Sequence, residues 1–183
     1  MEDISKKTLV IIDAQNDLID NNTESKKIIP NLVKLINNWD KNGRIFVTLD
    51  THENDYWNTL EGKYNQNEHC IYNTSGWYIN EYIKDALDSH PSYLVNFINK
   101  STFGSLKLIH DMSLVTWNNI ISTEEIYIAG FYTDTNVIAN ALLIRAQFPQ
   151  LKIYCYKNCC VGTNKETHDA ALRIMKQNNI EII

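Results

Sequence analysis

Short runs of apolar, mostly β-branched residues recur along the chain, and the first of them, residues 8–12, ends directly at Asp13. A continuous apolar run of this length is typical of a strand that is buried on both faces of a parallel sheet. Further runs of this kind occupy residues 44–49, 92–97, 125–129, 151–156 and 180–183. The chain is therefore expected to form about six strands.

Segments with helical spacing separate these runs. Apolar residues recur three or four positions apart within 28–36, 79–87, 137–144 and 171–175, as they do on a helix that buries one face. Alternating strands and helices predict right-handed βαβ units, and hence an α/β fold with three αβα layers around a mostly parallel, Rossmann-like sheet. The length of 183 residues fits one domain spanning 1–183. Folds of this class bind ligands at the carboxyl ends of their strands.

Composition narrows the classes of partner and the compartment. The net charge is −5, without any block of like charge, so neither nucleic acid nor an anionic membrane is an expected partner. No run approaches the roughly 20 apolar residues that span a bilayer, and the first seven residues lack the apolar core of a signal peptide. We therefore expect a cytoplasmic protein. Its cysteines lack paired CxxC spacing and are expected to be free thiols: Cys70, Cys155, Cys159 and Cys160.

Three charged residues lie at or just beyond the ends of three predicted strands. They are Asp13, Asp50 and Lys100. An aspartate in such a place is usually a helix cap or a turn residue, and that interpretation would be preferred for either one alone. Since parallel strands end at one rim of the sheet, the three together predict a charged functional cluster.

A metal site is a second candidate feature. Asp50 and His52 stand two residues apart at a strand end, and Glu61 and His69 follow in the segment 51–76, the longest without clear periodicity. Long loops of this kind in compact domains are usually functional or disordered. Zinc, manganese and iron all accept such nitrogen and oxygen ligands, with zinc preferred here. The alternative for either histidine alone is a solvated side chain in a polar loop.

Five segments in chain order carry a more specific pattern. They are Ile-Asp-Ala-Gln-Asn-Asp-Leu at 12–18, Thr-Leu-Asp-Thr-His at 48–52, His69 with Asn-Thr-Ser-Gly-Trp at 73–77, Lys-Ser-Thr-Phe-Gly-Ser at 100–105, and Gly-Phe-Tyr-Thr-Asp-Thr-Asn-Val at 130–137. Together they resemble the nicotinamidase branch of the isochorismatase-like hydrolases, also called cysteine hydrolases, and the resemblance covers most of the chain. It implies an isochorismatase-like six-stranded fold and a metal-containing amidase that acts on nicotinamide or a related heteroaromatic amide.

The resemblance also implies a role for each matching residue. Asp13 becomes the general acid/base and Lys100 the cation beside it. Asp50, His52 and His69 become metal ligands, and Glu61 matches an acidic position that ligates directly or through water in some members. A cis peptide is implied at Phe131–Tyr132, next to an oxyanion hole built from backbone amides. Positions that match or adjoin the pocket of the family, although packing alone would also explain them, are Leu18, Trp57, Phe103 and Tyr132.

The nucleophile segment departs from the family pattern at Asn136, where the family has its cysteine. A side-chain amide is a poor nucleophile and cannot form the thioester that divides the reaction into two easier steps. Activity is therefore expected to be absent or impaired, as in a pseudoenzyme. Asn136 is interpreted as a natural loss of activity, as an engineered substitution, or as part of another reaction.

Two alternative functions follow from this departure. One is a non-catalytic protein that binds a small molecule, because Asn can still hydrogen-bond a carboxamide. The other is an isochorismatase-type hydrolase in which an aspartate acts without cysteine, although the metal ligands are typically absent from that branch. Homo-oligomers are common in the family and are compatible with the apolar terminus at residues 182–183.

Overall fold

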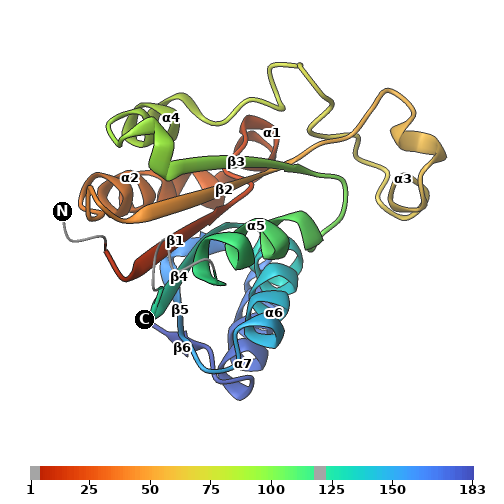
Figure 1. The fold of residues 1–183 in the computed structure, drawn as a ribbon. Coiled ribbons are helices and arrows are strands. Elements are labelled where there is room, and N and C mark those ends of the chain that lie inside the picture. Colours follow the sequence, from red (N-terminus) through yellow and green to blue (C-terminus); the bar gives the residue numbers. More distant parts are fainter. Residues whose placement is uncertain (1–4, 118–122) are drawn as a thin grey trace.

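The sheet has six parallel strands in the spatial order β3-β2-β1-β4-β5-β6 (Figure 1). A computed structural model describes residues 5–117 and 123–183, so the first four residues, which entered the expectation about targeting, lie outside it. The strands are β1 (Lys7–Ile12), β2 (Arg44–Asp50), β3 (Val95–Lys100), β4 (Glu125–Phe131), β5 (Lys152–Val161) and β6 (Glu181–Ile182). The predicted α/β class and the six-stranded parallel sheet are confirmed.

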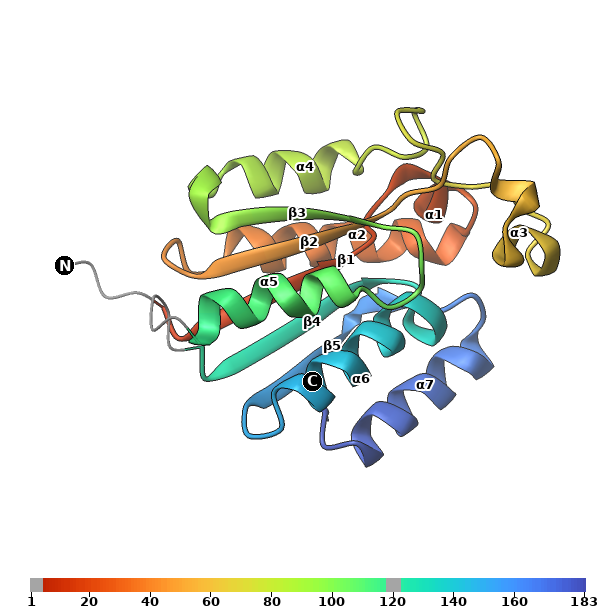
Figure 2. The same cartoon turned by 45° about the vertical axis from the view of Figure 1, so that its right-hand side comes forward.

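Helices cover both faces of this sheet. The α-helices are α1 (Asn16–Asp20), α2 (Thr23–Asn37), α3 (Leu60–Tyr64), α4 (Glu81–Asp88), α5 (Leu106–Trp117), α6 (Ile138–Gln147) and α7 (Lys165–Gln177). Helices α2 and α4 pack together on one face, whereas α5, α6 and α7 form the layer on the other (Figures 1 and 2). Short α3 projects from the main body, beyond the carboxyl ends of the strands (Figures 1 and 2).

The third strand begins later than its sequence pattern predicts. Residues Ser92–Leu94 form a short 3₁₀ turn, η2, after Pro91, and the strand starts only at Val95. The amide of Leu94 donates to the carbonyl of Pro91, which closes the turn and removes these residues from the sheet. The strand ends at Lys100, which lies opposite Asp50, the last residue of β2.

The other differences concern lengths and short helices. Strand β5 extends to Val161, beyond the expected end, and its register against β4 shifts between Ile128 and Gly130. Helical spacing did not reveal α1, α3 or α5, because the first two have five residues each and α5 has only a weakly amphipathic pattern. The expected free thiols are confirmed for all four cysteines.

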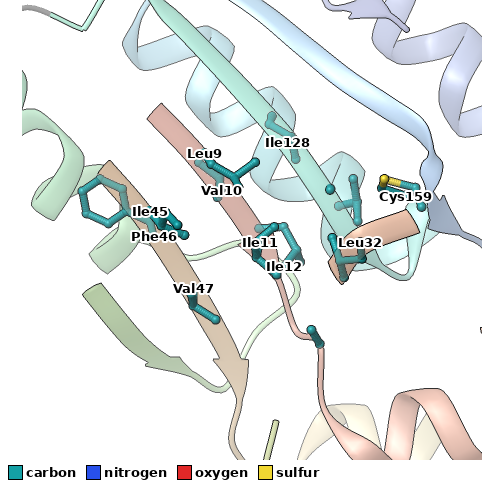
Figure 3. Close-up of a cluster of buried hydrophobic side chains, with 14 of the residues drawn as sticks. Leu9, Val10, Ile11, Ile12, Leu32, Ile45, Phe46, Val47, Ile128 and Cys159 are labelled. Atoms are coloured by element: carbon teal, nitrogen blue, oxygen red, sulfur yellow. The ribbon is translucent and has the colours of Figure 1, made fainter. Parts of the chain in front are cut away.

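The core is centred on β1, whose residues Leu9, Val10, Ile11 and Ile12 are fully buried between the helical layers (Figure 3). At the end of this strand, Gly130 of β4 approaches so closely that a Cβ atom there would lie 2.1 Å from the carbonyl oxygen of Ile12. Its φ of +132° also favours glycine. This close approach sets the strand ends β1 and β4 side by side, just before the segments that carry the candidate site.

No helix in the described part of the chain is both long and apolar enough to cross a membrane.

Candidate functional site

A buried ion-pair network joins the three charged residues predicted at the strand ends. The ammonium of Lys100 lies 2.7 Å from Oδ2 of Asp13 and 3.3 Å from Oδ1 of Asp50. All three side chains are at most 2% exposed. Strands β1, β2 and β3 are neighbours, so their ends bring the three residues together, as the sequence predicted.

The protonation of Asp13 is shifted toward neutral pH. Burial raises the pKa of its carboxyl to about 6, although the attraction of Lys100 acts in the opposite direction. The hydroxyl of Thr48 donates to Oδ1 of Asp13 at 2.7 Å and fixes the carboxylate. Burial lowers the pKa of Lys100, but the charges of Asp13 and Asp50 outweigh this effect and raise it, so the lysine stays protonated. Asp13 is therefore suited to accept and return a proton near neutral pH.

Gln15, a residue that sequence reasoning assigned no role, fixes the backbone around Asp50. Its Nε2 donates to the carbonyl oxygens of Asp50 and Trp77, both at 2.8 Å, and its Oε1 accepts from the amide of Asp50 at 2.7 Å. Asp17 plays a similar part, because its Oδ2 accepts from the amide of Cys70 at 2.7 Å. The signal available in the sequence was the run of polar residues at 15–17, between a buried strand and apolar Leu18.

The candidate metal ligands converge on one point at the end of β2. One ligand atom from each of Asp50, His52 and His69 lies within 4.8 Å of the others. Nε2 of His52 is 3.5 Å from Oδ1 of Asp50, and Nε2 of His69 is 3.6 Å from Oδ2 of Asp50. Glu61 approaches both imidazoles, at 4.0 Å from His52 and 3.6 Å from His69. The structure therefore brings together all four predicted ligands.

The donor atoms of this cluster fit a divalent cation. Nε2 of His52 and Oε1 of Glu61 are buried without a hydrogen-bond partner, and Oδ1 of Asp50 has only its ion pair with Lys100, so a further partner such as a cation would stabilise these atoms. Nδ1 of His69 lies 2.8 Å from the carbonyl oxygen of Asn67, so this bond orients the ring and leaves Nε2 directed at the cluster. Two imidazoles and two carboxylates form a donor set that zinc, manganese or iron accepts.

The pKa values of the two carboxyl groups in the cluster are shifted in opposite directions. Burial alone would raise the pKa of Asp50, but the adjacent imidazoles of His52 and His69 and the charge of Lys100 hold it well below its usual range. Burial, followed by the charge of Asp50, raises the pKa of Glu61. The raised pKa of Glu61 means that its negative charge is less stable in this cluster than in water, so a bound cation would stabilise it.

Asn136 lies in a π-helical turn, η3 (Thr133–Val137), which leads from β4 into α6. The cis peptide implied at Phe131–Tyr132 is present just before this turn. Nδ2 of Asn140 donates to the carbonyl oxygen of Asn136 at 2.7 Å and to that of Phe103 at 2.9 Å, so it ties the turn to the lysine segment. The side-chain Oδ1 of Asn136 is buried and has no partner.

A cavity of about 690 Å³ connects Asn136 with the candidate metal ligands. Three of the four predicted pocket residues line it, namely Leu18, Phe103 and Tyr132. The hydroxyl of Tyr132 donates to the carbonyl oxygen of Leu18 at 2.5 Å, which fixes one wall. Trp57 is not among the lining residues: it lies on the 3₁₀ helix η1 (Tyr56–Asn58), where Tyr56 turns inward beneath the histidines and Trp57 remains about half exposed. Contact between Trp57 and a ligand therefore stays a prediction.

No cysteine is among the described residues that line the cavity. Burial raises the pKa of the Cys70 thiol far above its usual value, and it raises the pKa of the Cys159 thiol to about 12. The Sγ atoms of Cys155 and Cys160 lie 3.8 Å apart within β5, and hydrogen bonding to Cys155 together with burial raises the pKa of Cys160. The thiols of Cys70, Cys159 and Cys160 therefore stay protonated, and weakly nucleophilic, at neutral pH.

Solved structures with the same fold include several amidases. A nicotinamidase/pyrazinamidase PncA from Bacillus subtilis has a TM-score of 0.82 and 23% identity, covering 97% of this chain and 99% of that chain. A pyrazinamidase of Pyrococcus horikoshii in complex with zinc has a TM-score of 0.78 and 22% identity, covering 98% and 99%. The yeast nicotinamidase Pnc1p bound to the inhibitor nicotinaldehyde has a TM-score of 0.75 and 19% identity, covering 97% and 99%.

The sequence comparisons are consistent with this likeness of fold. No curated protein matches the chain significantly. The family model described as Isochorismatase domain, however, matches residues 7–183, and the chain therefore belongs to the isochorismatase family.

Proposed function

We propose that this protein is a nicotinamidase-like member of its family that binds nicotinamide or a related small heteroaromatic amide, and that Asn136 blocks or slows hydrolysis. The observation that carries the proposal is the buried contact of 2.7 Å between Lys100 and Asp13, which is joined to the candidate metal cluster through Asp50. Fold neighbours include amidases for such amides. All these residues lie at the carboxyl rim of the sheet, where ligands of this fold class bind.

Each residue of this proposed machinery has a defined task. Oδ2 of Asp13 holds or releases the proton, and Lys100 stabilises the carboxylate when the proton has left. The flat ring lies against Phe103, Leu18 and Tyr132, which also exclude water. Asp50, His52, His69 and Glu61 would hold a divalent ion, which would supply a Lewis-acidic anchor for a ring nitrogen.

The missing step is nucleophilic attack. With cysteine at this position, the thiol would give its proton to Asp13 and attack the amide carbon, and Asp13 would return that proton to the departing ammonia. Water would then hydrolyse the thioester. Asn136 has no proton that Asp13 can remove near neutral pH, so the sequence of steps cannot begin.

The test is a comparison of the unmodified protein with its Asn136→Cys variant. Ammonia release from nicotinamide is measured with added zinc or manganese, and the variant Asn136→Cys/Asp13→Asn serves as the control that lacks the base. We expect turnover only in Asn136→Cys. Metal-dependent ammonia release by the unmodified protein would refute the block at Asn136, and inactivity of all three proteins would refute the amidase assignment.

A non-catalytic binding function is the second candidate, and one observation favours it. The buried, unpartnered Oδ1 of Asn136 can accept a hydrogen bond from a carboxamide N–H group, so the residue would complete a binding site instead of a catalytic one. Saturable binding of nicotinamide by calorimetry, without ammonia release even in Asn136→Cys, would favour this function over the first.

Further expectations from the sequence belong to the same proposal. We propose zinc as the bound ion, a single isochorismatase-like domain spanning 1–183, a cytoplasmic location and a homo-oligomeric state. Elemental analysis would weaken the aspartate-led, metal-free alternative if it found one metal ion per chain.

A further inference from the structure

A second, mainly apolar groove opens beside the candidate site. Its volume is about 610 Å³, and helix α3 forms one side of it while the segment 101–103 after β3 forms the other. Leu60, Tyr64 and Phe103 line it and are 72%, 85% and 47% exposed. Two of these large apolar side chains lie on α3, the helix that projects from the body (Figures 1 and 2), and Phe103 faces them across the groove, so the three mark a contact surface.

The groove adjoins the cavity that Asn136 lines. Glu61, Asn65 and Phe103 line both hollows, so these residues form a shared wall. His52, a candidate metal ligand, also lines the groove. A molecule whose ring occupies the cavity could therefore extend past Phe103 into the groove without leaving the protein surface.

The charge of the groove restricts what can enter it. Carboxylates of Glu53, Asp55 and Glu61 line it, and none of its described lining residues is a lysine or an arginine. An anionic group would be repelled there, whereas an uncharged apolar group would gain contact with the side chains of Leu60, Tyr64 and Phe103.

We propose that the natural ligand is a heteroaromatic amide with an uncharged apolar substituent, whose ring occupies the cavity and whose substituent lies in the groove between α3 and Phe103. This inference rests on the proposed function and defines its substrate class. It also explains the combined size of the two hollows, about 690 Å³ and about 610 Å³, which exceeds the needs of a single ring.

The experiment is calorimetry on the zinc-supplemented protein, in which the proposed block at Asn136 leaves the ligand intact. The probes are nicotinamide and a panel of hexylnicotinamides, one for each ring carbon that carries only hydrogen. Carboxypentyl analogues of equal length serve as charged controls. We expect one hexyl isomer to bind at least about tenfold more tightly than nicotinamide, because most of its methylene groups leave water, and its carboxypentyl analogue to lose this gain.

Matched variants locate the contact. Leu60→Ala/Tyr64→Ala removes two exposed groove residues and is expected to abolish the gain while nicotinamide affinity stays unchanged. The control Leu114→Ala/Tyr82→Ala truncates two side chains that are 49% and 60% exposed and line neither hollow, so it should leave the gain in affinity intact. The urea midpoints of both variants are expected to equal that of the parent, which excludes misfolding as the cause.

Other outcomes would overturn the inference. If nicotinamide binds but no hexyl isomer binds more tightly, or if the gain survives Leu60→Ala/Tyr64→Ala, the groove does not hold the substituent although the proposed function stands. If neither nicotinamide nor any analogue binds, both proposals fail. A dimer in solution that dissociates in Leu60→Ala/Tyr64→Ala would assign the groove to a second copy of the chain.

Discussion

Replacing Lys100 by Met should strongly destabilise the protein at alkaline pH. The substitution keeps most of the side-chain volume but removes the cation that lies 2.7 Å from Asp13 and 3.3 Å from Asp50. Removing one partner of a buried ion pair costs about 3–5 kcal/mol, because the remaining charge is neither solvated nor neutralised. With a denaturant dependence of about 2 kcal/mol per molar urea, the unfolding midpoint should fall by about 1.5–2.5 M.

Urea unfolding at pH 8 measures this loss, with a chelator present so that no metal ion compensates Asp50. The matched control is Lys107→Met, which removes a lysine that is 62% exposed and pairs with Asp111 four residues away on α5. Such a surface pair contributes at most about 1 kcal/mol, so the control should unfold near the parent midpoint.

A double variant separates the charge from the packing. Asp13→Asn/Lys100→Met removes one stranded carboxylate together with the cation, and it should therefore recover part of the stability that Lys100→Met loses. Equal midpoints for Lys100→Met and Lys107→Met would refute the argument that a buried ion pair organises the site. A double variant less stable than Lys100→Met would refute the assignment of the loss to unpaired charge.

Three further predictions follow from other contacts. The pKa of Asp13 is about 6 in the folded state, whereas an aspartate in the unfolded chain has a pKa near 3.8, so this residue should lower stability progressively as the pH rises between these values. Urea midpoints of Asp13→Asn relative to the parent should reveal that trend. His69→Ala should lose most of its bound zinc in elemental analysis, whereas His90→Ala, whose ring contacts a carbonyl oxygen of α2 far from the cluster, should retain it. Gly130→Ala should lose about 1–3 kcal/mol of unfolding free energy and therefore unfold at a lower urea concentration, since its Cβ would meet the carbonyl of Ile12. An unchanged midpoint would contradict the close approach.

Much of the fold was predictable because its signal is local. The fully buried run of β1 reads as a central strand from its apolar residues alone, and alternating helical segments imply parallel connections. The later start of β3 was not predictable from hydrophobicity, since residues 92–94 are as apolar as a strand and only Pro91 and the turn closed by Leu94 exclude them. Short helices α1 and α3 give too few turns for any periodicity to emerge.

The candidate site was predictable to the level of residue types and their order. Asp13, Asp50 and Lys100 were expected at one rim because parallel strands end there, and the structure places them in one ion-pair network. The roles of Gln15 and Thr48 could not be foreseen, because each depends on a hydrogen bond to a partner 35 residues away, with no pattern in the chain between them.

The sequence by itself determined the order along the chain of the candidate site residues, the likeness to the family, and the presence of asparagine at position 136 where the family has cysteine. All three are properties of residue type and spacing. Only the tertiary structure decided that Trp57 is not among the residues that line the cavity, whereas Phe103 lines both the cavity and the groove. It also decided that burial raises the pKa of Asp13 to about 6. Burial and side-chain direction arise from contacts between distant segments, and such contacts leave no periodic trace in the chain.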